Sequence, residues 1–249
     1  MGKIIVLIIV YFISGLISVA ITEALGIEST NAVVAGTVFI TFCILYLMKR
    51  INLKEIFGKW NIKKESFFWG LNYFIANLFA LFILEKLFPF FETKNHLVNK
   101  PTIISMILLS LIIPIVEEVF FRGIICNLLI KKYSPIMSII ISGVIFAFGH
   151  GSIGLIFLLT GSSFYFGYIY IKSNSLWNSI IVHVINNSII SIISYYLSGN
   201  ESTNDNSLGV IYYIVGVLSL SLCFYNLYRM YKSFNFKKII KKDKYKNYI

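Results

Sequence analysis

Hydrophobic residues occur along this chain in long runs that are separated by short polar breaks. A helix needs roughly 18 or more apolar residues in a row to cross the hydrocarbon core of a bilayer, and most of the runs reach or approach that length. The pattern therefore predicts an all-α protein, a polytopic transmembrane helical bundle of about eight spans. The expected spans are Ile4–Ile27, Ala32–Met48, Phe67–Phe91, Thr102–Ile130, Pro135–His150, Ile153–Ile171, Leu176–Leu197 and Leu208–Tyr231.

Composition agrees with insertion into a membrane and argues against other classes of protein. Of the 249 residues, 57% are hydrophobic and 13% are charged, against about a quarter charged in soluble domains. The net charge of +11 does not indicate nucleic acid, because the basic residues lie between hydrophobic runs. The three cysteines are scattered within apolar runs, which is not the pattern of a disulfide framework or of a cysteine metal site.

The positions of lysine and arginine indicate how the spans are oriented. Loops on the cytoplasmic side of a membrane are enriched in these residues. With both termini in the cytoplasm, 18 of the 22 Lys and Arg residues fall on the inside. The outside loop 199–207 holds Glu201 and Asp205 and no basic residue. We therefore expect a multi-pass protein of the cell membrane with both termini cytoplasmic.

The chain is expected to divide into three parts. Residues 1–101 form N-terminal transmembrane helices, residues 102–197 form the core helices that carry the candidate chemistry, and residues 198–249 form the last span and a basic tail. Such a tail can rest on anionic lipid headgroups. The first apolar stretch is longer than the core of a signal peptide, which favours an uncleaved first span over a signal peptide.

Three ionisable residues lie amid apolar neighbours in the fourth expected span: Glu117, Glu118 and Arg122. An unpaired charge inside a bilayer costs several kcal/mol, so each needs a partner or a function. The four-residue spacing puts Glu118 and Arg122 on one helix face, where they can pair, whereas Glu117 points about 100° away. Glu117 is then the uncompensated carboxylate, suited to act as a general base toward water. The alternative interpretation is a structural charge cluster that holds helices together.

The same span contains Pro114, four residues after Ser110. Proline lacks a backbone N–H, so we expect the hydrogen bond to the Ser110 carbonyl to be missing and the helix to be kinked there. Kinked helices at mid-membrane often line a site.

Two of the three histidines fall in expected spans, whereas His96 lies in an expected outside loop. His150 closes a Phe146-x-x-x-His150 element. His183 lies one helical turn before Asn187, so both side chains can reach into one cavity and hold water or a carbonyl oxygen. Asn186 is expected to face elsewhere. A lone histidine on an apolar helix is more often a satisfied core residue, but two histidines together with buried glutamates favour a catalytic site.

The chain resembles the CPBP intramembrane proteases over about residues 100–195. This family includes the type II CAAX prenyl endopeptidases, bacteriocin-processing and self-immunity proteins, and proteins similar to lysostaphin resistance protein A. The resemblance rests on three motifs that follow in order on three expected helices, Glu117-Glu118-x-x-x-Arg122, Phe146-x-x-x-His150 and His183-x-x-x-Asn187.

The resemblance implies a bundle of eight or a similar number of helices, and hydrolysis of a peptide bond inside or at the edge of the membrane. It implies that Glu117 activates the attacking water and that His150 positions it. The other motif residues would form two pairs, Glu118 with Arg122 as a supporting pair and His183 with Asn187 as the stabiliser of the oxyanion.

Two histidines and a glutamate are also the ligand set of a catalytic zinc site, which would here be Glu117, His150 and His183. The chain lacks the H-E-x-x-H zinc signature. Two interpretations stay open: a glutamate-dependent hydrolase that requires no metal, favoured slightly, and a metalloprotease with a divalent metal such as zinc.

The leading hypothesis is an endopeptidase that cleaves a hydrophobic, membrane-associated or lipidated peptide or protein, in CAAX-type processing or in bacteriocin maturation and self-immunity. Membrane lipids are the other expected partner. The alternative is a non-catalytic membrane immunity or scaffolding protein that uses the polar cluster only for structure. A proton-coupled transporter is disfavoured, because the hydropathy shows no inverted repeat.

Overall fold

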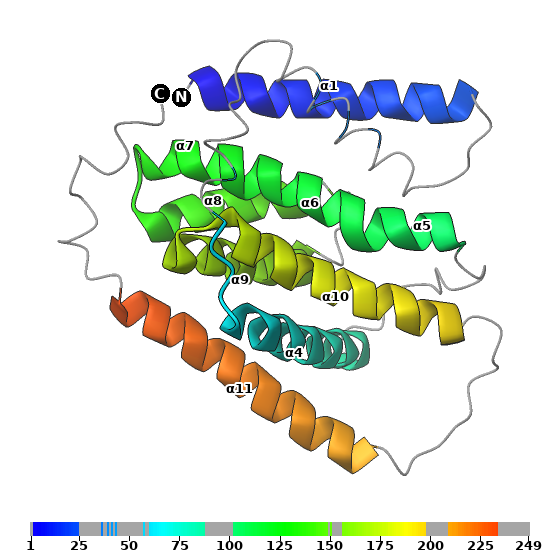
Figure 1. The fold of residues 1–249 in the computed structure, drawn as a ribbon, viewed down its shortest axis with the longest axis vertical. Coiled ribbons are helices and arrows are strands. Elements are labelled where there is room, and N and C mark those ends of the chain that lie inside the picture. Colours follow the sequence, from blue (N-terminus) through cyan, green and yellow to red (C-terminus); the bar gives the residue numbers. More distant parts are fainter. Residues whose placement is uncertain are drawn as a thin grey trace.

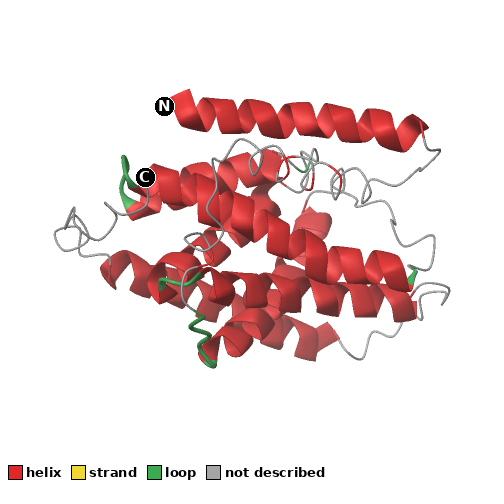
Figure 2. Cartoon of the chain, turned by 45° about the horizontal axis from the view of Figure 1, so that its top comes forward, coloured by secondary structure: helices red, strands yellow, loops and turns green. Residues whose placement is uncertain are grey.

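The structure is a computed structural model that describes residues 2–24, 36, 39, 41, 43, 57, 60–87, 102–148, 150, 156–197 and 209–233. All regular structure in these residues is helical and none of them lies in a strand (Figure 2). Helices occupy seven of the eight expected spans. The expected span Ala32–Met48 lies outside the described residues except for four single positions, and the loop 199–207, His96 and the tail from residue 234 lie outside them as well.

The helical stretches in the described part of the chain begin and end close to the expected span limits. The fourth stretch, Ile103–Ile130, is continuous but changes register several times. The elements are α1 (Gly2–Ala24), α4 (Glu65–Leu87), α5 (Ile103–Ile107), η2 (Leu108–Ile112), α6 (Ile113–Glu118), η3 (Val119–Cys126), α7 (Asn127–Ile130), α8 (Pro135–Phe148), α9 (Ile156–Ser173), α10 (Leu176–Leu197) and α11 (Gly209–Ser233), where η denotes a π-helix.

Helix α10 lies near the middle of the bundle (Figure 1). It packs along η2 and α6 on one side and against α4 on another, and α11 covers α4 in turn. Helices α8 and α9 pack against each other, and both contact η3. Helix α1 lies on the opposite side of the bundle from α11, where Tyr11 stacks on Phe120 with ring centroids 5.0 Å apart. The chain therefore surrounds α6 and η3 with other helices.

Two of the described helices, Ile103–Ile130 and Leu176–Tyr196, are long and apolar enough by length and composition to cross a membrane. Large hydrophobic side chains also stand exposed on the outside of the bundle. Ile104 is 72% exposed, Leu16 is 73% exposed and Tyr196 is 71% exposed. Soluble monomers rarely expose apolar surface this extensive. These features indicate a membrane protein, whereas the number of spans and their orientation stay predictions.

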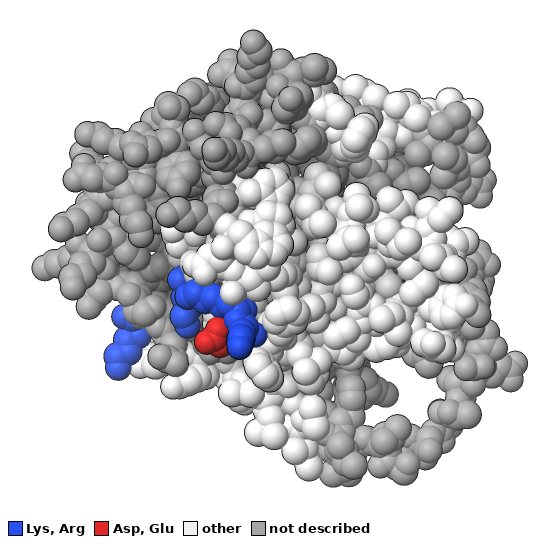
Figure 3. Space-filling view, viewed as in Figure 1, with Lys and Arg blue, Asp and Glu red and all other residues white. Residues whose placement is uncertain are grey.

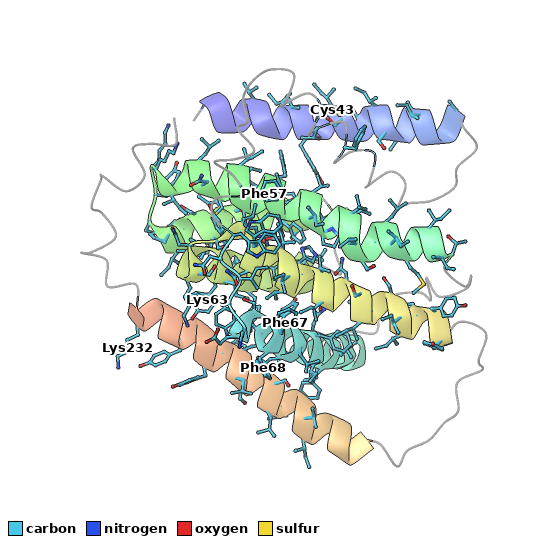
Figure 4. The ribbon with its side chains drawn as sticks, viewed as in Figure 1. Cys43, Phe57, Lys63, Phe67, Phe68 and Lys232 are labelled. Carbon is cyan, nitrogen blue, oxygen red and sulfur yellow. The ribbon has the colours of Figure 1, made fainter. Side chains whose placement is uncertain are left out.

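Charged side chains gather toward one side of the face shown in Figure 3, and most of the remaining described surface there is uncharged. Figure 4 places Lys63, just before α4, and Lys232, in the last turn of α11, toward this same side. The end of α7, which Lys131 and Lys132 follow, also lies toward it in Figure 1. Lysines from three expected cytoplasmic segments therefore share one side of the molecule.

Pro114 acts through a π-helical register. The N–H of Ile113 donates to the carbonyl of Leu108, five residues back, so the next carbonyl in this register, that of Leu109, would need the N–H that Pro114 lacks. The side-chain nitrogen of Asn187 donates to the Leu109 carbonyl instead, at 3.1 Å. The expectation named Ser110 because it assumed an α-helical register, and the π register moves the unpaired carbonyl one residue back.

Candidate active site

All six predicted site residues are among those that the structure describes, and they come from three segments. Four of them are almost fully buried: Glu117, Glu118, Arg122 and His183 have exposed fractions of 2%, 0%, 1% and 4%. The segments are α6 with η3 (Glu117, Glu118, Arg122), the turn after α8 (His150) and α10 (His183, Asn187).

Glu118 is held by donors from three directions. Arg122 Nη1 lies 2.7 Å from Glu118 Oε1, so the ion pair expected from their spacing is present. The ring nitrogen Nδ1 of His183 lies 2.9 Å from the same oxygen, and the Ser179 hydroxyl donates to Oε2. The second guanidinium nitrogen of Arg122 donates to the hydroxyl and the carbonyl of Ser163, at 2.7 and 3.1 Å. A buried ion pair needs such added hydrogen bonds to offset desolvation.

Aromatic rings wall this polar cluster. The ring of Phe166 stacks on the imidazole of His183, with centroids 4.5 Å apart. Phe146 lies 4.5 Å from the imidazole of His150. The guanidinium of Arg122 lies between the two phenyl rings, 5.1 Å from one centroid and 5.3 Å from the other. Cations interact favourably with ring faces at these distances, so the rings help to fix the Arg122 side chain.

Glu117 faces two imidazole rings. Its Oε1 lies 3.4 Å from His150 Nε2 and its Oε2 lies 3.7 Å from His183 Nε2. The Nδ1 of His150 lies 2.9 Å from the Phe146 carbonyl, which can only accept, so this nitrogen carries a proton. The Nδ1 of His183 is committed to Glu118 in the same way. In a neutral ring the Nε2 is then an acceptor, so the space beside Glu117 calls for a shared donor such as water.

The side-chain amide of Asn187 has hydrogen-bond partners on both its nitrogen and its oxygen. Its amide nitrogen donates to Leu109, and its amide oxygen accepts from Asn186 Nδ2 at 3.1 Å. Stabilising an oxyanion would require that nitrogen to leave the Leu109 carbonyl, so this role stays a prediction. Asn186, which was expected to face elsewhere, is buried with 5% of its surface exposed, and its side chain contacts that of Asn187.

Sequence reasoning missed Ser179 and Ser163, which hold the Glu118–Arg122 pair in place. A signal for Ser179 was available, because it precedes His183 by four residues and so lies on the same helix face. Ser163 carries no comparable signal. Its contact with Arg122 arises from the packing of α9 on η3.

Glu117 and the two histidines are the residue types that bind zinc in proteins. Each histidine also donates a hydrogen bond from its Nδ1–H to an oxygen, as metal-binding histidines do with their second ring nitrogen. Within the described part of the chain, however, no group of three His, Cys, Asp or Glu side chains is arranged to hold a metal ion. Participation of a metal therefore stays a prediction, and no step below is derived through one.

Similarity to known proteins falls on the segment that carries these residues. Residues 99–189 match the family model described as Type II CAAX prenyl endopeptidase Rce1-like. The predicted resemblance is confirmed over this segment. A Bacillus subtilis (strain 168) protein named "Putative membrane peptidase YdiL" is 31% identical over 90 residues. No solved structure matches the chain.

These matches cover only part of the chain. The alignment with YdiL covers 36% of this chain and 37% of the relative, so it spans little more than a third of either protein. The activity of the whole chain is therefore a matter for proposal.

Proposed function

We propose that this chain is an intramembrane endopeptidase, embedded in the cell membrane by several spans, which hydrolyses a peptide bond with water activated by Glu117. The observation that carries the proposal is the geometry around Glu117. A buried carboxylate faces two imidazole nitrogens at 3.4 and 3.7 Å, and both rings use their other nitrogen as a donor elsewhere. Similarity of residues 99–189 to the Rce1-like family supports the same reaction class.

The attacking water bridges Glu117 and His150 from one side in this mechanism. It donates one hydrogen bond to Glu117 Oε1 and the other to His150 Nε2, and so supplies a donor to both acceptors. Glu117 takes the proton as the water oxygen attacks the scissile carbonyl carbon. His150 stays in place because its Nδ1 is tied to the Phe146 carbonyl.

The tetrahedral oxyanion is stabilised by His183 from the other side of Glu117. With a proton on both ring nitrogens, His183 keeps its bond to Glu118 and offers Nε2–H to the oxyanion. Glu117 is neutral at this stage, and the charges of Glu118, Arg122, the imidazolium and the oxyanion sum to zero, which lowers the cost of burying them. When the C–N bond breaks, Glu117 returns its proton to the leaving amine.

The substrate that fits this setting is a hydrophobic, membrane-associated or lipidated peptide. The site lies among helices whose outer surfaces are apolar, so a peptide that reaches it must tolerate apolar surroundings. Processing of CAAX-type tails and maturation of bacteriocin-like peptides are both reactions of this class. The matched family's description names a prenyl endopeptidase, which makes a prenylated peptide the first substrate to try.

The test is cleavage by purified protein in detergent. The probes are fluorogenic apolar peptides with and without a farnesylated cysteine near the C-terminus. Glu117→Gln should lower kcat/KM by at least about 100-fold, because a positioned general base contributes at least that much. Glu65→Gln, which changes an exposed carboxylate in the first turn of α4, is the matched control and should leave the rate unchanged. Parent-like cleavage by Glu117→Gln would overturn the mechanism.

A second arm of the same experiment addresses the metal. The parent protein is incubated with a zinc chelator, dialysed and assayed again, and its metal content is measured before and after. The proposal expects an unchanged rate in protein without bound metal. Loss of activity that returns only on adding zinc would overturn the metal-free mechanism and show that the working enzyme uses zinc.

A further inference from the structure

A relay of hydrogen bonds fixes the orientation of two neighbouring side-chain amides on α10. The Leu109 carbonyl can only accept, so Asn187 must present its nitrogen there. The side-chain oxygen of Asn187 therefore faces Asn186, and the side-chain nitrogen of Asn186 donates to it. The relay leaves Asn186 Oδ1 as a free acceptor, and it begins with the missing N–H of Pro114.

The oxygen at the end of this relay is buried without a partner. Asn186 is 5% exposed, and its Oδ1 is one of two buried side-chain polar atoms among the described residues that have no hydrogen-bond partner; the other is Ser175 Oγ. A buried polar atom left unpaired costs stability, so its presence in a folded protein needs an explanation. A bound ligand that supplies the missing donor would be one.

Asn186 lies on the helix that carries His183 of the catalytic cluster. Asn186 lies one turn beyond His183 on α10, and His183 contacts both glutamates. Helix α10 runs alongside η2 and α6, which precede and carry Glu117 (Figure 1). The free oxygen therefore lies along the stretch of α10 between the Glu118 contact of His183 and the Leu109 contact of Asn187.

We propose that Asn186 Oδ1 accepts a backbone N–H of the bound peptide, which makes Asn186 a substrate-positioning residue; this inference rests on the proposed endopeptidase function. An extended peptide in an apolar site carries N–H groups that water no longer solvates, and each needs an acceptor. An amide oxygen supplies one without adding another negative charge beside Glu117 and Glu118. A backbone N–H of a peptide is therefore a suitable partner for Asn186 Oδ1.

The first test compares two substitutions that each remove one of the unpaired buried atoms. Ser175→Ala should leave the thermal unfolding midpoint in detergent equal to or above that of the parent, whereas Asn186→Leu also removes the donor to Asn187 Oδ1 and should lower the midpoint slightly. Only Asn186→Leu should raise KM, by about 10-fold, which is the effect of losing one hydrogen bond of 1.4 kcal/mol. Its kcat should change little. Equal KM values for Asn186→Leu and the parent would overturn the inference.

The second test changes the substrate and leaves the protein intact. In a series of peptides, each backbone N–H in turn is replaced by an ester oxygen. One ester position should raise KM about 10-fold with the parent protein and should cause no further loss with Asn186→Leu. If Asn186→Leu does not fold, the ester series on the parent decides alone. Uniform KM values across the series would show that Asn186 binds water or nothing.

Failure of this inference is distinguishable from failure of the proposed function. If the parent cleaves the probes, Glu117→Gln does not, and Asn186→Leu behaves as the parent, then only the role of Asn186 is wrong. If the parent cleaves no probe while its fold is intact, both proposals fall together.

Discussion

The two glutamates of the site are neighbours in sequence and equally buried, yet their surroundings differ. Glu118 accepts from a guanidinium, an imidazole and a hydroxyl. Glu117 faces imidazole nitrogens at 3.4 and 3.7 Å on rings that already donate elsewhere. A carboxylate with a full set of donors is stabilised in its folded position. A carboxylate without a close hydrogen-bond donor, such as Glu117, is available to bind and activate water. The contrast therefore distinguishes a structural glutamate from a catalytic one.

The helix geometry produces this contrast. Adjacent residues of a helix point about 100° apart, so one carboxylate can be turned to donors of η3 and α10 while its neighbour also faces the turn after α8. The change from α6 to the π-helix η3 occurs directly after Glu118. Such π segments are often found at functional sites.

The largest effect is expected from breaking the ion pair between Glu118 and Arg122. Arg122→Leu leaves Glu118 buried without its cation, and removing one partner of a buried ion pair costs about 3–5 kcal/mol. The free energy of unfolding in detergent should fall by that amount. Lys232→Met removes an exposed cation at the end of α11 and should have little effect. A stability loss of the same size in both variants would show that Arg122 is not specially placed.

A smaller effect is expected from removing a single donor to Glu118. Ser179→Ala should cost about 1.5–3 kcal/mol, because its hydroxyl donates to a charged group. Ser142 is also buried, but its hydroxyl donates to the neutral Phe121 carbonyl at 2.9 Å, so Ser142→Ala should cost about 0.5–1.5 kcal/mol. Only Ser179→Ala should also lower kcat, since it loosens the carboxylate that orients His183. The reverse order of the two stability losses would contradict the assignment.

The smallest effect on stability is expected from restoring the backbone N–H that Pro114 lacks. Pro114→Ala restores an N–H that can donate to the Leu109 carbonyl, so the loss caused by Asn187→Ala should shrink in that background. A double-mutant cycle of unfolding free energies should give a coupling on the order of 1 kcal/mol. Strict additivity of the two substitutions would mean that Asn187 does not substitute for the missing backbone donor.

Much of this arrangement could be predicted from the sequence, because it depends on local spacing. The runs of apolar residues predicted helices where the structure has them, from α4 to α11. The four-residue interval between Glu118 and Arg122 predicted their ion pair, which is present at 2.7 Å. Helical periodicity carries this information directly.

The remaining features depend on tertiary packing and on register. Ser163 reaches Arg122 only because α9 packs on η3, a contact between residues 41 positions apart. The π register around Pro114 turned Asn187 toward Leu109, which an α-helical reading of the span could not foresee.

The central claim is that Glu117 performs chemistry while Glu118 maintains structure. Its most direct test measures the cleavage rate and the free energy of unfolding for Glu117→Gln and Glu118→Gln side by side. We predict that Glu117→Gln abolishes cleavage with stability equal to or above that of the parent, and that Glu118→Gln loses several kcal/mol of stability because Arg122 loses its counter-ion. Parent-like cleavage by Glu117→Gln, or an equal loss of stability in both variants, would contradict the account.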